Sequence, residues 1–419
     1  MSLDRTQAPS FSLSTDYSLT QPELFAFPSG QPLYAFRGLQ QGVVKLELVF
    51  RSGKWYEPAS GVSHFTAQML RKGTRTRSAF EIAEALDRLG AHLEIVAGFD
   101  TVTVSLFVLK KNLFPALDIL LDLLHEPSFP EEEIRLEKEI FIQNLRVSNE
   151  KTSVLASREI RKTLFGVTHP YGNSTIEADV DIIKSDDLRD FFRKHMRLHA
   201  AYFVGAVETE ELNQLIKRFN APTASSTSLS QPAIQTGVSH AVVKPGSVQV
   251  SLRLGKLCMM RAADAGYFDC VMVNHLLGGY FGSRLMKNIR EKKGLTYGIG
   301  SGMHHFVNNS FWYVRAEVNQ QHAQQALDEI RNEIRNLQEE PVSQNELDVA
   351  TNYFIGSWQS DNATLFAVAE KVRSLHEHDL PDDYYNRLLG HLRNMTPVDV
   401  QRAAKKYFGA DDLVEIRVG

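Results

Sequence analysis

Residues 61–74, GVSHFTAQMLRKGT, decide how the first half of the chain is interpreted. Apolar residues recur in this stretch at helical spacing, so it predicts a helix. A helical H-x-x-E-H motif places two histidines one turn apart, with a glutamate as general base for a zinc-bound water. Here the three positions are His64, Ala67 and Gln68. Alanine cannot accept a proton and glutamine is a poor zinc ligand, so His64 is either a packed helical residue or the remnant of a metal site.

Composition sets the broad class of the protein. The chain has 419 residues, 43% of them hydrophobic, which favours two or more packed domains. Its formal net charge of -4 does not suggest a polyanion partner, and two cysteines do not make a disulfide scaffold. Residues 1–19 show neither the basic nor the apolar region of a secretory signal, and no apolar run is long enough to span a membrane. We therefore expect a soluble protein, of the cytoplasm or, if a signal was removed, of the periplasm.

An internal repeat divides the chain. Residues 220–237 are rich in Ser, Thr, Ala and Pro and carry no charge, which is typical of a linker. On either side, Ile134 corresponds to Leu347 and Phe141 to Phe354, and the two pairs are separated by the same interval. A fixed offset indicates duplication. We predict an N-terminal domain at 1–219, a linker at 220–237 and a C-terminal domain at 238–419.

The fold class follows from the pattern within each half. Alternating apolar runs such as residues 43–53 and 248–257 predict strands, and capped amphipathic segments predict helices between them. Both halves place a strand pair before a helix. We expect an α+β fold in which each half is an antiparallel-rich sheet with helices packed on one face.

The frame G-V-S-H-F-x-x-x-M-L-x-K-G-T resembles the active-site helix of the pitrilysin/insulinase family of zinc metallopeptidases, the inverted zincins. The resemblance implies the duplicated metallohydrolase fold of that family. It also implies a third zinc ligand, a glutamate on a later helix that follows an acidic segment, and the matching position is Asn144. Three of the four required groups are then replaced, at Ala67, Gln68 and Asn144. The expectation is a degenerate zinc site, with no catalytic residue and no metal in this chain.

Residues 276–302, LLGGYFGSRLMKNIREKKGLTYGIGSG, are similar to the family's C-terminal segment. The resemblance implies that Arg290 and Tyr297 hold the substrate backbone and polarise the scissile carbonyl, and that a loop with Gly278 and Gly279 shapes access to substrate. A guanidinium and a phenol can both donate hydrogen bonds to a developing oxyanion. Without the resemblance, Arg290 is interpreted as a solvated charge and Tyr297 as an ordinary strand residue.

The resemblance further implies a role in a two-chain assembly. Small members of this family work as two-chain assemblies. In the heterodimeric cases one chain carries the zinc motif and the other, like the non-catalytic subunit of mitochondrial processing peptidase, lacks it and holds substrate. We expect a substrate-binding subunit that acts on extended peptides beside a homologous zinc-bearing partner. A purely structural or binding subunit is the alternative, and an active homodimeric zinc peptidase with atypical ligands is a third. No nucleic-acid partner is expected, and the isolated chain could form a homodimer.

Overall fold

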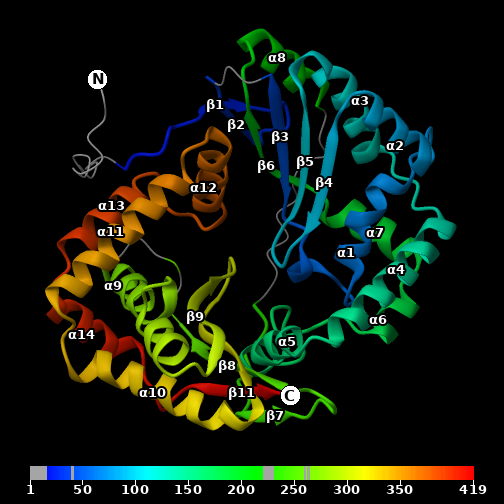
Figure 1. Cartoon of the computed structure of the whole chain (residues 1–419). Coiled ribbons are helices and arrows are strands. Elements are labelled where there is room, and N and C mark those ends of the chain that lie inside the picture. The colour runs from blue at the N-terminus through cyan, green and yellow to red at the C-terminus, as the bar shows by residue number, and fades with distance from the viewer. Residues whose placement is uncertain (1–16, 39–41, 220–230, 259–260, 262–264) are drawn as a thin grey trace, which may run out of the picture.

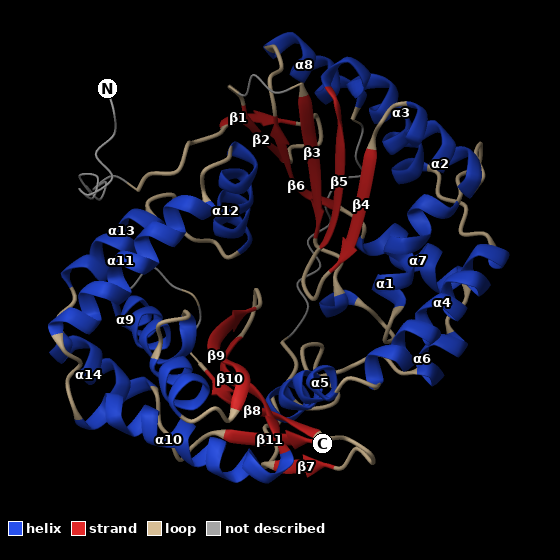
Figure 2. Cartoon of the chain, viewed as in Figure 1, coloured by secondary structure: helices blue, strands red, loops and turns tan. Residues whose placement is uncertain are grey.

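The computed structural model describes residues 17–38, 42–219, 231–258, 261 and 265–419. Two sheets dominate these ranges, one built from each half of the chain, and the two halves trace a ring (Figure 1). Colouring by secondary structure shows helices around the outside of this ring and the sheets nearer its centre (Figure 2). The mixed α+β architecture predicted from the sequence is confirmed.

The first sheet has the strand order β1-β2-β6-β3-β5-β4. Neighbouring strands are antiparallel except β2 and β6, which are parallel. Its strands are β1 Glu23–Ala26, β2 Pro32–Phe36, β3 Val43–Phe50, β4 His92–Ala97, β5 Val102–Leu109 and β6 Leu198–Val204. The helices of this half are α1 Val62–Met69, α2 Ala79–Arg88, α3 Leu113–His125, α4 Glu131–Asn149, α5 Thr152–Phe165, α6 Glu177–Ile182, α7 Ser185–His195 and α8 Thr209–Arg218.

The second sheet has the strand order β7-β11-β8-β10-β9, in which only the β7–β11 pair is parallel. Its strands are β7 His240–Val242, β8 Gln249–Leu257, β9 Thr296–His305, β10 Ser310–Asn319 and β11 Val414–Val418. The helices of this half are α9 Ala265–Asn274, α10 Ala323–Glu339, α11 Gln344–Asp361, α12 Leu365–Glu377, α13 Tyr384–Asn394 and α14 Pro397–Tyr407. Two π-helical segments, His275–Gly279 and Met286–Lys292, precede β9.

The duplication is visible in the helix boundaries. Helices α4 and α11 begin at Glu131 and Gln344, and α5 and α12 begin at Thr152 and Leu365. Both pairs keep the constant interval that the sequence suggests. Residues 220–230 of the predicted linker lie outside the described residues, and 231–237 form neither helix nor strand. The domain boundaries themselves stay a prediction.

Each sheet has two differently covered faces. Leu46 and Leu48 of β3 point into the core shared with the helices of the first half. The residues between them point to the opposite face, because side chains alternate along a strand. That second face receives α12 of the other half, and the second sheet in turn receives α5 of the first half. The two halves therefore exchange one equivalent helix each (Figure 1).

The junction of α5 with the second sheet is largely aromatic. Phe306, after β9, stacks on Tyr171 with a ring-centroid distance of 3.9 Å and contacts Phe99 at 4.9 Å. The Tyr171 hydroxyl donates to the carboxylate of Asp100, whose other oxygen accepts from the backbone N–H of Val307 at 3.1 Å. Aromatic pairs in such geometry add stability beyond the burial of their area. This junction fixes the β9–β10 hairpin against the first half.

The junction of α12 with the first sheet contains buried charge. Glu47 of β3 forms ion pairs with Arg373 of α12, at 2.8 Å, and with Lys45, at 2.5 Å. Beside them, the ring of His376 lies 4.2 Å from that of Tyr34 and shares a hydrogen bond of 3.1 Å with the Tyr202 hydroxyl. Buried ions need such pairing to offset their loss of hydration. The two halves are thus held together at two separate places.

Candidate functional site

Helix α1 is fixed by the loop that precedes it. The carboxylate of Glu57 accepts from the backbone N–H groups of Gly61 and Ser63, at 3.1 and 3.3 Å. These are N–H groups that a helix start leaves without an intrahelical acceptor. Burial raises the pKa of Glu57 to about 7. The Ser63 hydroxyl donates to the carbonyl of Ser52 at 2.8 Å, which ties the helix to the end of β3.

His64 packs among aromatic rings. Its ring lies 5.4 Å from that of Phe65 and 5.0 Å from that of Phe141 of α4. Burial lowers the pKa of His64, and the nearby carboxylate of Glu137 opposes this shift in part. One side of His64 lines a cavity of about 160 Å³, together with Glu57 and the backbone after β4. The predicted helix is confirmed, and in it His64 is a half-buried, packed residue.

The two residues that follow His64 in the motif, Ala67 and Gln68, take part in packing and hydrogen bonding within the first half. Ala67 is fully buried, so its methyl group faces the core. The side-chain amide of Gln68 donates to the carbonyl of Ile95 on β4 at 3.3 Å, and its oxygen accepts from Arg71 at 2.9 Å. Neither residue offers a carboxylate or an imidazole.

Asn144 lies on α4, which packs against α1, and its side chain is exposed. The carboxylate that acts on His64 from this helix is Glu137, which is 8% exposed and pairs with Lys72 at 3.5 Å. Within the described ranges, no group of three His, Cys, Asp or Glu side chains is placed to hold a metal ion. The residues at the zinc positions do not fit zinc, which takes about three protein ligands in a catalytic site.

Arg290 and Tyr297 come together in the second half. Arg290 lies on the π-helical segment Met286–Lys292, and Tyr297 lies at the start of β9. The guanidinium carbon is 5.5 Å from the centre of the Tyr297 ring and 4.9 Å from that of Phe281. Tyr297 is 90% exposed. The side chains form one surface group in which a cation contacts two rings.

The two predicted glycines lie in a π-helical turn, where the sequence suggested a loop. A Cβ at Gly278 would lie 2.5 Å from the backbone nitrogen of Ser301 on β9, so the glycine permits close packing of that turn on the strand. Gly279 is exposed, and a Cβ there would lie 3.2 Å from His275. Their predicted role toward substrate stays a prediction.

The sequence did not reveal a cluster of three cations, one of which, Lys54, lines the cavity beside His64. They are Lys54, Arg158 and Arg161. The spacing of Arg158 and Arg161 places them on one face of a helix, which is the signal that could have found them. Their proximity to Lys54 depends on contacts between segments far apart in the sequence, and no local pattern indicates it.

The fold and helix α1 together indicate the class of metallopeptidase scaffolds, and α1 has His64 at the first position of the H-x-x-E-H motif and Ala67 and Gln68 at its last two. Residues 39–179 match the family model described as Insulinase (Peptidase family M16), and residues 183–354 match the one described as Peptidase M16 inactive domain. These segments cover most of the chain, and the chain belongs to peptidase family M16.

Similar proteins come from several bacteria. An uncharacterized zinc protease of Rickettsia bellii is 27% identical over 73% of this chain and 76% of its own length. The non-peptidase homolog YmxG of Helicobacter pylori is 24% identical over 88% of this chain and 87% of its own. The crystal structure of a peptidase M16 inactive domain from Pseudomonas fluorescens has a TM-score of 0.84, with 24% identity over 95% of this chain and 98% of that one. This last likeness concerns the fold. Within the described residues, no helix is long and apolar enough to cross a membrane.

Proposed function

We propose that this chain is the non-catalytic, substrate-binding subunit of a two-chain zinc endopeptidase that acts on extended peptides. The observation that carries the proposal is the contrast between its two halves. The positions expected to carry the general base and two of the zinc ligands hold Ala67, Gln68 and Asn144, whereas Arg290 and Tyr297 lie together with the phenol exposed. A sister chain with an intact H-x-x-E-H helix supplies the zinc and the general base.

In this role the chain's own residues bind and orient the peptide. The guanidinium of Arg290 and the phenol of Tyr297 donate hydrogen bonds toward the peptide carbonyl, the kind of contact that stabilises an oxyanion when the donors are fixed in advance. Strand β9 ends the second sheet and β4 ends the first, so each has an unpaired edge within the described residues. Addition of an extended peptide to such an edge is a common mode of peptide capture.

The test is reconstitution with a zinc-bearing M16 chain encoded in the same genome. The purified chain, the sister chain and their equimolar mixture are assayed on extended fluorogenic peptides. The proposal expects no hydrolysis by this chain alone and faster hydrolysis by the mixture than by the sister. A mixture no faster than the sister, with a stable complex, would favour the structural alternative. Chelator-sensitive cleavage by this chain alone would favour an active homodimer.

A further inference from the structure

Three cationic side chains converge where α5 meets residues 172–178, and none forms an ion pair with a carboxylate in the described ranges. Each is bound to a neutral oxygen. Lys54 Nζ donates to the carbonyl of Asn173 at 2.7 Å, Arg161 donates to the carbonyl of Ser157 at 2.8 Å, and Arg158 donates to the side-chain oxygen of Asn149. The Nε of Arg161 is buried and has no acceptor among the described atoms.

The three positive charges act on one another. Burial lowers the pKa of Lys54, the carboxylate of Glu57 opposes this shift in part, and the guanidinium groups of Arg161 and Arg158 add to it. Burial also lowers the pKa of Arg161 to about 10, and Arg158 adds to this shift. Cations withdrawn from water are normally paired with anions. A cluster without such pairing raises the local positive potential and attracts an anion.

The carboxylates near the cluster already have other partners. Glu57 accepts from the first N–H groups of α1, and Asp179 accepts from the N–H of Ile176 at 2.9 Å. Glu159 pairs with Lys162 at 3.2 Å, and Glu177 pairs with Arg146 at 2.6 Å. The described part of the chain therefore supplies no dedicated anion for these three cations.

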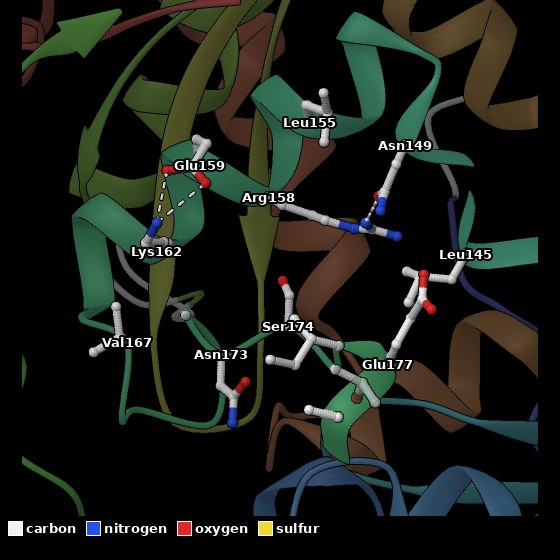
Figure 3. Close-up of a pocket in the computed structure, with 14 residues that line it drawn as sticks. Leu145, Asn149, Leu155, Arg158, Glu159, Lys162, Val167, Asn173, Ser174 and Glu177 are labelled. Atoms are coloured by element: carbon white, nitrogen blue, oxygen red, sulfur yellow. Dashed lines mark hydrogen bonds and ion pairs between the residues drawn. The ribbon is translucent and has the colours of Figure 1, made fainter. Parts of the chain in front are cut away.

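Arg158 is the member of this cluster that lines a cavity of about 710 Å³ (Figure 3). In Figure 3 the side chain of Arg158 extends from α5 toward Asn149, and Asn173 and Ser174 lie across from α5. Apolar walls come from Leu145, Leu155, Val167 and Ile176. The volume falls in the range of small-ligand sites, which combine apolar walls with a few polar groups.

This cavity is next to the altered zinc position. Thr175 lines both the 710 Å³ cavity and the 160 Å³ cavity beside His64, and Lys54 lines the latter. The smaller cavity is also lined by Ala97 at the end of β4, one of the two sheet edges that the proposed function offers to a peptide.

We propose that this cavity is a carboxylate-binding pocket for peptides, with Arg158 as the direct contact and Arg161 and Lys54 supplying further positive charge. The carboxylate is the C-terminus of a peptide or an acidic side chain near it, and the apolar walls take a neighbouring side chain. The guanidinium of Arg158 carries five N–H donors, which leaves several for a carboxylate besides the one used by Asn149. The peptide nature of the ligand rests on the proposed function, whereas the carboxylate chemistry rests on the cluster alone.

The experiment measures binding to the isolated full chain by calorimetry. One extended peptide is prepared in two C-terminal forms, the free acid and the amide. The amidated peptide is also prepared with either Glu or Gln at one internal position. We expect the free-acid or the Glu form to bind about 10-fold more tightly than the amidated Gln form, as a charge-assisted hydrogen bond provides. The preferred form identifies whether the chain end or the side chain is bound. Equal affinity of all forms would overturn the proposal.

Variants locate the site. Arg158→Gln should remove the preference, whereas the control Arg135→Gln, an exposed arginine of α4 paired with Glu132 and Glu139, should keep it. If Arg158→Gln kept the preference for the carboxylate form, or if both Arg158→Gln and Arg135→Gln lost it, the assignment to Arg158 would be overturned. Because Arg158→Gln could disturb folding, acetate competition against the acidic peptide on the unaltered chain is a second measurement. Failure of acetate to compete would also overturn it.

The same titrations separate this proposal from the proposed function. N-acetylglutamate that binds the chain, and binds less well after Arg158→Gln, supports the pocket even when no extended peptide binds, and only the peptide-holding function then fails. Peptides that bind with equal affinity whatever their charge support peptide holding, and only the carboxylate pocket then fails.

Discussion

Helix α1 in the first half and the segment around Arg290 in the second half differ in what their polar side chains are used for. On α1, Gln68 is bonded to Ile95 and Arg71, and His64 packs against rings. In the second half, Tyr297 is 90% exposed, and Arg290 contacts its ring and that of Phe281. The polar side chains on α1 are occupied by contacts within the protein, whereas the exposed phenol of Tyr297 is accessible to a ligand.

This difference suggests how one scaffold can lose metal chemistry without losing its structure. With alanine at the motif's general-base position, Ala67, and glutamine at its second histidine position, Gln68, α1 is still packed and hydrogen-bonded to its neighbours. The helix exchange of α5 and α12 holds both halves in place through contacts that do not involve the zinc positions. Fold and chemistry are therefore separable here, as function on a shared fold resides in its site.

The largest expected effect concerns Arg290 and Tyr297. In the mixture with a zinc-bearing sister, Arg290→Ala or Tyr297→Phe should slow peptide hydrolysis about 10- to 1000-fold, because each removes a donor to the developing oxyanion. Steady-state rates on an extended peptide measure this. Lys287→Ala, an exposed change on the same π-helical segment, serves as control. Unchanged hydrolysis rates in both Arg290→Ala and Tyr297→Phe would contradict a role in substrate binding for the second half, and the two halves would then not differ in this respect.

A smaller effect tests the role of the π-helical turn. Gly278→Ala should destabilise the chain by about 1–3 kcal/mol, because its Cβ would lie 2.5 Å from Ser301 N and 2.9 Å from a Leu285 methyl group. Gly298→Ala, whose Cβ would meet nothing within 4 Å, should be near neutral. Urea unfolding compares the two. Equal stability, with peptide binding lost only in Gly278→Ala, would show that the glycine acts on substrate and not on packing.

The smallest effect concerns His64. Its change to Phe should alter the free energy of unfolding by less than about 1.5 kcal/mol at pH 7, because the ring packs against Phe65 and Phe141. The folded-state pKa of His64 lies below that of the unfolded chain, so protons favour the unfolded state as pH falls below about 6.5, and stability is lost there.

His64→Phe should therefore lose less stability between pH 7 and pH 5 than the unaltered chain does. Denaturant unfolding at several pH values measures this difference, with His92→Phe on β4, an exposed histidine, as the matched control. An identical pH dependence in His64→Phe and the unaltered chain would contradict the burial of a neutral imidazole at this position.

Much of the fold could be predicted because it follows from local periodicity. The helix at 62–69 and the constant interval between the two halves both come from residue patterns, and the structure confirms them. The exchange of α5 and α12 could not be predicted, since an apolar helix face does not say which sheet it covers. The sequence predicts replacement at Ala67 and Gln68, yet the cluster of Lys54 with Arg158 and Arg161 arises from contacts between distant segments.

The central claim is that this chain has kept the means to hold a peptide and has lost the means to hydrolyse it. Peptide hydrolysis and zinc content of the pure chain, measured before and after treatment with a chelator and after addition of zinc, test it most directly. The account predicts no hydrolysis under any of these conditions and no stoichiometric zinc. Hydrolysis that a chelator abolishes and zinc restores, in material free of any second chain, would contradict it.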